Sequence, residues 1–150
     1  MIGSETIGGR SKPLLWLLAL YGLASLAHFV HNAEYLGGYP NLPAWLSRSQ
    51  IYGVWCGITA IGVAGYTLYR RGHSGLGFCL LVLYTALGFD GLLHYQRAPV
   101  AAHTAAMNLT IVLEAAAAAL ALVAVVTVAG RGITSFSRGP RLDDARRPGE

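Results

Sequence analysis

The sequence predicts an all-α integral membrane protein, folded as a bundle of four transmembrane helices. Hydrophobic residues make up 54% of the 150-residue chain and charged residues only 12%, whereas a soluble domain has about 25% charged residues. The apolar residues form four long runs, and most of the basic residues lie between or beyond these runs. A composition this apolar and this poor in charge excludes both a soluble domain and a disordered chain.

The four apolar runs cover residues 13–30, 51–69, 74–93 and 105–129, and they are 18, 19, 20 and 25 residues long. About 20 residues of helix are needed to cross a hydrocarbon core of about 30 Å. A backbone in lipid must satisfy its own hydrogen bonds, so each run is predicted to be a helix. We expect the first run to be retained rather than cleaved as a signal peptide, because its end is a poor cleavage site and three more runs follow.

The basic residues predict the orientation of the bundle. Nine of the eleven precede the first run, lie between the second and third runs, or follow the fourth run. Basic connections stay in the cytoplasm, so both termini are predicted to be cytoplasmic. The chain is thus expected to comprise a cytoplasmic segment 1–12, a four-helix membrane domain 13–130 and a basic, disordered cytoplasmic tail 131–150.

The connection 36–49 falls on the extracytoplasmic side in this orientation. Its glycines and prolines disfavour a regular helix, and its aromatic residues suit the membrane interface. These residues are Gly37, Gly38, Tyr39, Pro40, Pro43 and Trp45. We therefore predict an extracytoplasmic lid loop between the first and second helices.

Polar residues inside the spans mark the candidate site, because charges and imidazoles in a bilayer are costly. The predicted orientation brings them to the extracytoplasmic end of the bundle, where the ends of helices one, three and four are expected to converge. His28 and His31, at i and i+3, share one helix face. Asp90 and His94, at i and i+4, are expected to form a hydrogen bond that orients the imidazole.

This combination of imidazoles and carboxylates suits a transition metal such as zinc, iron or copper, held between facing helices. The predicted ligands are His28, His31, Asp90 and His94. Possible additional site residues are His103, Asn32, Glu34 and Asn108. Glu114 lies two to three turns deeper than His103, so we expect it outside the ligand shell, as the acid or base of a proton transfer.

Two short motifs resemble those of known membrane proteins. Asp90-x3-His94 followed by His103 resembles the copper-binding motif of the membrane subunit of particulate methane and ammonia monooxygenases, over about 14 residues and with a shorter downstream spacing. That resemblance implies a membrane metal site with this geometry. The stretch His31-Asn-Ala-Glu34-Tyr35 is similar to the HxxEE motif of a family of small membrane proteins, with tyrosine in place of the second glutamate.

The leading hypothesis is therefore a metal-binding membrane enzyme or a metal-binding accessory protein, with a small apolar or lipid-like substrate. A haem b site is disfavoured because carboxylates crowd the same face. A proton-coupled transporter is an alternative, although the cytoplasmic halves of the spans lack ionisable residues. A structural subunit of a larger complex is another, because alanine- and glycine-rich helix faces favour homo- or hetero-oligomers.

The expected environment follows from the same composition. Membrane lipid is the expected partner. Nucleic acid is not expected, because the basic residues flank the apolar runs in the pattern that sets the orientation of a membrane protein. The alanine, glycine and arginine bias is compatible with a bacterial inner membrane.

Reporter fusions at Gly38 and Gly130 test the orientation. The basic asymmetry predicts that Gly38 is extracytoplasmic and Gly130 cytoplasmic, because positively charged connections are retained inside. An alkaline phosphatase fusion should then be active at Gly38 and inactive at Gly130. Fusions that report the same side at both positions contradict the four-span topology.

Overall fold

A computed structural model describes residues 5–137 of the chain. Every regular element in this range is helical: α1 (Glu5–Glu34), η1 (Leu36–Gly38), α2 (Arg48–Arg70), α3 (Ser74–Leu87), η2 (Asp90–Leu93), α4 (His94–Arg97), η3 (Val100–Ala102) and α5 (Ala105–Ser137). Four helical segments, residues 12–34, 48–70, 74–97 and 105–131, are long and apolar enough to cross a membrane. The prediction of an all-helical chain with four helices long and apolar enough to cross a membrane is confirmed.

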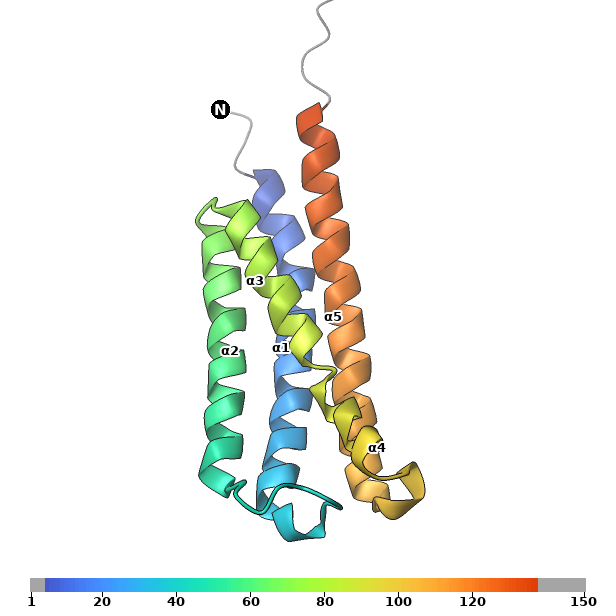
Figure 1. Cartoon of the computed structure of the whole chain (residues 1–150). Helices are drawn as coiled ribbons and strands as arrows, with labels where there is room; N and C mark the ends of the chain where they lie inside the picture. Colours follow the sequence, from blue (N-terminus) through green and yellow to red (C-terminus); the bar gives the residue numbers. More distant parts are fainter. Residues whose placement is uncertain (1–4, 138–150) are drawn as a thin grey trace, which may run out of the picture.

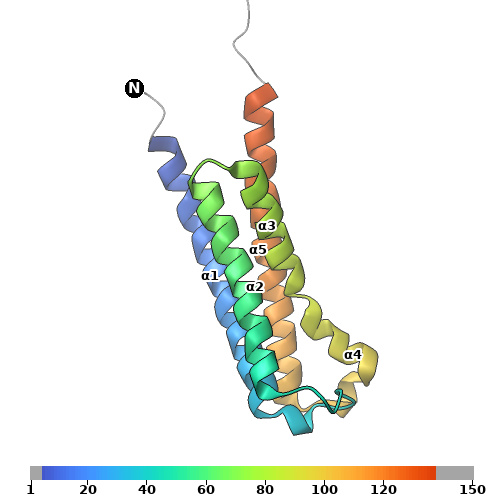
Figure 2. The same ribbon diagram turned by 60° about the vertical axis from the view of Figure 1, so that its left-hand side comes forward.

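The helices lie side by side in one bundle (Figures 1 and 2). α1 packs against α5 and α2, and α3 packs against α2 and α5. The start of α1, the α2–α3 turn and the end of α5 lie at one end, here called the terminal end. The connections 35–47 and 98–104 lie at the opposite end, here called the loop end.

Two helices extend beyond the apolar runs that predicted them. α1 begins at Glu5, so Pro13 lies inside the helix and not in its first turn. α5 continues to Ser137, so the first part of the predicted disordered tail is helical, and positions 138–150 lie outside the described residues. An apolar run marks only the residues that lipid can cover. The backbone hydrogen bonds of the helix continue beyond that run until a capping residue ends the helix.

The third span is broken, although a single helix was predicted over 74–93. α3 ends at Leu87, and the chain continues through the 3-10 segment η2 into the short α4. The break coincides with a close approach at Gly88, where an added Cβ would lie 2.5 Å from Cε2 of Tyr21 on α1 and 2.6 Å from Cβ of Ala118 on α5. An irregular backbone inside a membrane span is stable only where protein shields it from lipid. Here α1 and α5 provide that shield.

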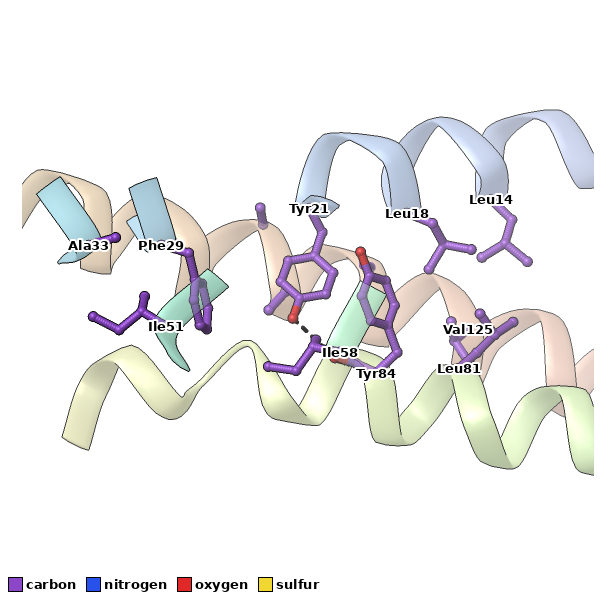
Figure 3. Packing of buried hydrophobic residues seen from close by; sticks show 13 residues of the cluster. Leu14, Leu18, Tyr21, Phe29, Ala33, Ile51, Ile58, Leu81, Tyr84 and Val125 are labelled. Carbon is purple, nitrogen blue, oxygen red and sulfur yellow. Dashed lines mark hydrogen bonds between the residues drawn. The ribbon is translucent and has the colours of Figure 1, made fainter. Parts of the chain in front are cut away.

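An apolar core runs along the length of the bundle, which Figure 3 shows in detail. Tyr21 and Tyr84 lie at its centre, with ring centroids 4.6 Å apart, and the Tyr21 hydroxyl donates to the carbonyl oxygen of Tyr84 at 3.1 Å. This bond joins α1 to α3 three residues before α3 ends. The core therefore holds the last turn of α3 in place, and through it the start of the break.

Gly88→Ala should lower the free energy of unfolding by about 1–3 kcal/mol, the cost of overpacking a tight contact. The new methyl group would collide with Tyr21 and Ala118. Gly75→Ala in α3 is the matched control, because nothing lies within 4 Å of the added Cβ. Unfolding in detergent, followed by circular dichroism, measures both. Equal stability of the two variants would show that Gly88 is not closely packed.

Candidate functional site

His28 of α1 and Glu114 of α5 form a deeply buried polar contact between two helices. Nε2 of His28 lies 3.7 Å from Oε2 of Glu114, and the two residues are 2% and 0% exposed. Glu114 thus lies beside His28, whereas the sequence placed it apart from the histidines. The two helices run in opposite directions, and each residue lies roughly 9–14 Å from the loop end of its helix at 1.5 Å per residue.

The hydrogen bonds around His28 determine its tautomer. Nδ1 of His28 lies 3.3 Å from Oγ1 of Thr110, and this hydroxyl donates its own proton to the carbonyl oxygen of Met107 at 3.0 Å. The Thr110 oxygen therefore accepts from the Nδ1–H of His28, which leaves a lone pair on Nε2. That lone pair faces the Glu114 carboxyl group, whose two oxygens have no hydrogen-bond partner.

Two groups that only accept hydrogen bonds repel each other at this distance inside a low-dielectric bundle. The contact is favourable when one proton lies between them, with Glu114 as a carboxylic acid that points its hydrogen toward Nε2. A charged pair at this depth would incur a large desolvation cost. The geometry therefore indicates a neutral pair that binds one proton.

The break in the third span completes the walls around this pair. A Cβ added to Gly91 in η2 would lie 3.3 Å from Oε2 of Glu114 and 3.4 Å from Nε2 of His28. Ser25, one turn before His28 on α1, is buried beside Glu114. Neither residue was singled out from the sequence. The sequence did contain a signal for Gly91, because it is a glycine inside an apolar span and directly follows the acidic residue Asp90.

His94 lies next to His28, with ring centroids 5.7 Å apart, as expected if the ends of these spans converge. Its Nε2 lies 3.4 Å from Nδ2 of Asn32, and its Nδ1 has no partner. The hydrogen bond predicted between Asp90 and His94 is absent from this arrangement, and Oδ1 of Asp90 is also unpartnered. The 3-10 geometry of η2 has three residues per turn, so positions i and i+4 no longer share a face.

Tyr39 belongs to the site, although the sequence suggested a lid residue at the membrane interface. It is only 4% exposed, and its hydroxyl lies 2.9 Å from Nδ1 of His31. Its ring lies against that of His94, with centroids 4.8 Å apart. The connection that carries it is tied to the end of α4 because Nδ2 of Asn41 donates to the carbonyl oxygen of Arg97 at 2.8 Å. Burial raises the pKa of Tyr39 to about 12.

The remaining predicted residues have roles at the edge of the site. The ring of His103 lies 6.1 Å from that of His94 between centroids, and its Nδ1 donates to the carbonyl oxygen of Pro99 at 3.1 Å. Asn108 accepts from the Tyr95 hydroxyl at 2.9 Å and donates to two backbone carbonyls, so it closes the α4–α5 connection.

Glu34 does not face the buried pair. It accepts from the Tyr52 hydroxyl at 2.9 Å and pairs with Arg48 at 3.2 Å, which joins the end of α1 to the start of α2. Exposed ion pairs of this kind contribute little to stability.

The predicted metal ligands are not arranged as one ligand set. Within the described residues, no group of three or more His, Cys, Asp or Glu side chains is placed to hold a metal ion. The reason is that the imidazoles are turned to different partners. His28 faces Thr110, His31 faces Tyr39, and His94 faces Asn32.

A pocket of about 620 Å³ opens at the loop end, within the range of 300–1,000 Å³ that small ligands occupy. Its lining comprises His31, Glu34, Tyr35, Gly37, Gly38, Thr104, Ala106 and Met107. His31 thus contacts both this pocket and the buried Tyr39. In the terminal half of the bundle, residues 13–27, 53–69, 75–89 and 115–129 include no acidic, basic or histidine residue. The acidic and histidine side chains of these spans therefore lie toward the loop end.

Comparison of the chain with protein families, curated proteins and solved structures finds no match. The functional argument therefore rests on the residues themselves.

The raised pKa of Tyr39 predicts the alkaline behaviour of the loop. The ordinary tyrosine pKa is about 10 and the buried one about 12. The stability that depends on the neutral phenol is therefore fully present below about pH 10 and is lost as the pH rises through about 12. The difference in phenolate absorbance between wild type and Tyr39→Phe should titrate near 12 in folded protein. A difference that titrates near 10 would show that Tyr39 is exposed.

Proposed function

We propose that the chain is a membrane protein with an embedded acid–base site, in which the His28–Glu114 pair binds one proton and transfers it to and from a small substrate. The observation that carries this proposal is the buried approach of His28 Nε2 to Oε2 of Glu114 at 3.7 Å, with Nδ1 of the same ring 3.3 Å from the Thr110 hydroxyl. Such a pair stores a proton without placing a net charge in lipid. In this assignment Glu114 is the acid or base, and His28 positions its proton.

The chemistry of the site suits general acid–base catalysis. The protonated carboxyl of Glu114 would give its proton to the substrate, and the carboxylate left behind would take one back from the loop end. The apolar walls and the exposed aliphatic surface of the spans favour an apolar or lipid-like substrate. An extracytoplasmic loop end is part of the proposal and follows from the positions of the basic residues. A bacterial inner membrane is also part of it, and rests on the alanine, glycine and arginine bias of the sequence.

A one-ended path favours catalysis or binding over proton-coupled transport. Transport needs a proton path to both sides of the membrane, and relays of this kind use Asp, Glu and His side chains. The spans carry such residues only toward the loop end. A transporter would therefore need a large rearrangement to release the proton at the terminal end.

A metal-binding enzyme or accessory protein is the second candidate. It is favoured by three buried atoms that have no partner: Oδ1 of Asp90, Nδ1 of His94 and Nε2 of His103. Zinc, iron or copper would suit these donors, although binding would require the imidazoles to turn toward one point. A purely structural subunit would leave these buried groups without a purpose, since unsatisfied polar atoms lower stability.

Infrared spectroscopy of the purified chain in lipid tests the proposal. We expect a stretching band from a protonated carboxyl group at neutral pH, lost in Glu114→Gln and shifted in His28→Ala, because Nε2 of His28 lies 3.7 Å from the carboxyl oxygen. Glu34→Gln is the control and should leave the band unchanged, since Glu34 is an exposed carboxylate paired with Arg48.

The same preparation separates the two candidates. Metal ligands must be deprotonated, so stoichiometric metal by elemental analysis, with no carboxyl band that depends on Glu114, would overturn the acid–base proposal and favour a metal site. A metal-free preparation with the band present is the expected result.

A further inference from the structure

The loop-end pocket lies where two of the apolar spans end. Glu34 is the last residue of the span 12–34, and Met107 belongs to the first turn of the span 105–131. The backbone of Gly38 packs closely between them, since an added Cβ would lie 3.2 Å from Cε of Met107. The ends of membrane spans coincide with the polar headgroup layer of a bilayer. We therefore expect this pocket to lie at the level of the lipid headgroups.

The charged groups at the pocket are one carboxylate and one guanidinium beside it. Glu34 lines the pocket, and its Oε2 lies 3.2 Å from Nη2 of Arg48, with both side chains exposed. The other carboxylate oxygen accepts a hydrogen bond from Tyr52 at 2.9 Å. An exposed ion pair is weak, so an ionic ligand can replace either partner of the Glu34–Arg48 pair. A ligand that suits both residues carries a cation and an anion close together.

Two aromatic rings form the wall next to this carboxylate. His31 and Tyr35 line the pocket, and their ring centroids lie 4.7 Å apart. The imidazole is held in place because its Nδ1 lies 2.9 Å from the Tyr39 hydroxyl, whereas the ring of Tyr35 is exposed. The face of an exposed tyrosine ring attracts an ammonium group. The pocket wall therefore suits the cationic part of such a ligand.

An exposed apolar surface leads from the pocket along the two helices. On α5, Leu109 and Leu113 follow the lining residue Ala106 by three and seven residues, so they share its helix face. On α1, Val30 precedes Glu34 by four residues and shares its face in the same way. All three apolar side chains are exposed, and α1 packs against α5. A molecule with its polar group in the pocket can place hydrocarbon chains on this surface.

We propose that the loop-end pocket binds the headgroup of a zwitterionic phospholipid, with its ammonium at Glu34 and Tyr35 and its phosphate at Arg48. A guanidinium binds phosphate through charge-assisted, often bidentate hydrogen bonds. The acyl chains lie along the exposed apolar surface of α1 and α5. This inference rests on the proposed acid–base function, for which it names the substrate class. The buried pair lies about one helical turn deeper than the pocket, because His28 precedes His31 by three residues.

Other ligands fit the same residues less well. An anionic phospholipid without an amine would pair with Arg48 but would leave the Glu34 carboxylate beside a second negative charge. A soluble zwitterion would satisfy both charges but would leave the apolar surface beside the pocket uncovered. A zwitterionic lipid satisfies the two charges, the aromatic wall and the apolar surface together.

Binding of short-chain phospholipids to the full-length chain in a non-ionic detergent tests this inference by isothermal titration calorimetry. The probe is dihexanoyl phosphatidylethanolamine. Dihexanoyl phosphatidylglycerol keeps the phosphate and the chains but lacks the ammonium, and glycerophosphoethanolamine keeps the headgroup but lacks the chains. We expect phosphatidylethanolamine to bind at least about tenfold more tightly than phosphatidylglycerol, the effect of one hydrogen bond to a charged group. It should also bind more tightly than glycerophosphoethanolamine.

Variants at the pocket identify the groups that bind the headgroup. Glu34→Gln should weaken binding of phosphatidylethanolamine by about tenfold. Tyr52→Phe is the matched control with wild-type affinity, because it removes the hydroxyl that donates to Glu34 but keeps the carboxylate. Tyr35→Leu should weaken binding by about threefold, whereas Tyr35→Phe keeps the ring face and should bind as the wild type does. Arg48→Gln should lower the affinity for both phospholipids, since both carry the phosphate.

Equal affinity for the two phospholipids, or an unchanged affinity in Glu34→Gln, would overturn the inference. Binding of glycerophosphoethanolamine as tight as that of the lipid would overturn it too, because the apolar surface would then contribute nothing. The carboxyl band of Glu114 is measured in the same preparation. A band without lipid preference overturns this inference alone. Lipid preference without the band overturns the proposed function and leaves the pocket as a headgroup site.

Discussion

The contact between the imidazole of His28 and the carboxyl group of Glu114 constrains the rest of the loop half of the bundle. Lipid raises the cost of any unpaired charge or lone pair at this depth, so the two groups must share a proton and be shielded. Thr110 supplies the hydrogen bond that directs Nε2 toward the carboxyl group. Gly91 supplies the close backbone wall, since a side chain there would press on both groups. The third span must leave the α-helix to bring Gly91 into this position.

The bundle thereby combines two parts with different tasks, an apolar core along its length and a polar site in its loop half. The apolar core fixes the helices relative to one another, and the contact of Tyr21 with Tyr84 joins α1 to the end of α3. The loop half contains the polar groups and the irregular backbone. Irregular backbone is tolerated in a membrane where it lines a protein interior, and broken helices beside buried ionisable groups are a recurring way to build sites in membrane proteins. The connection that carries Tyr39 packs against the loop half through the contacts of Tyr39 with His31 and His94.

The spans and the gathering of polar residues at one end could be predicted, because lipid penalises polar groups strongly enough for composition alone to reveal both. The break after Leu87 could not, because apolar composition is the same for an α-helix and for a buried 3-10 segment. The burial of Tyr39 could not be predicted either. A tyrosine that precedes a proline in a glycine-rich connection is also typical of the membrane interface. The metal hypothesis assumed that histidines on facing helices point at a common centre. Helix spacing predicts faces, but the partner of each ring nitrogen depends on rotamers and on neighbours such as Thr110 and Asn32, which are distant in sequence.

The protonation state of His28 is the most direct measure of this account. Solid-state NMR of the chain in lipid, labelled with nitrogen-15 in its histidines and assigned with His28→Ala, resolves the two ring nitrogens. The account predicts a neutral imidazole with a proton on Nδ1 and an unprotonated Nε2 that faces the Glu114 carboxyl group, and a loss of this tautomer preference in Thr110→Val. A doubly protonated imidazolium, or a neutral ring with its proton on Nε2, would contradict the shared proton between His28 and Glu114.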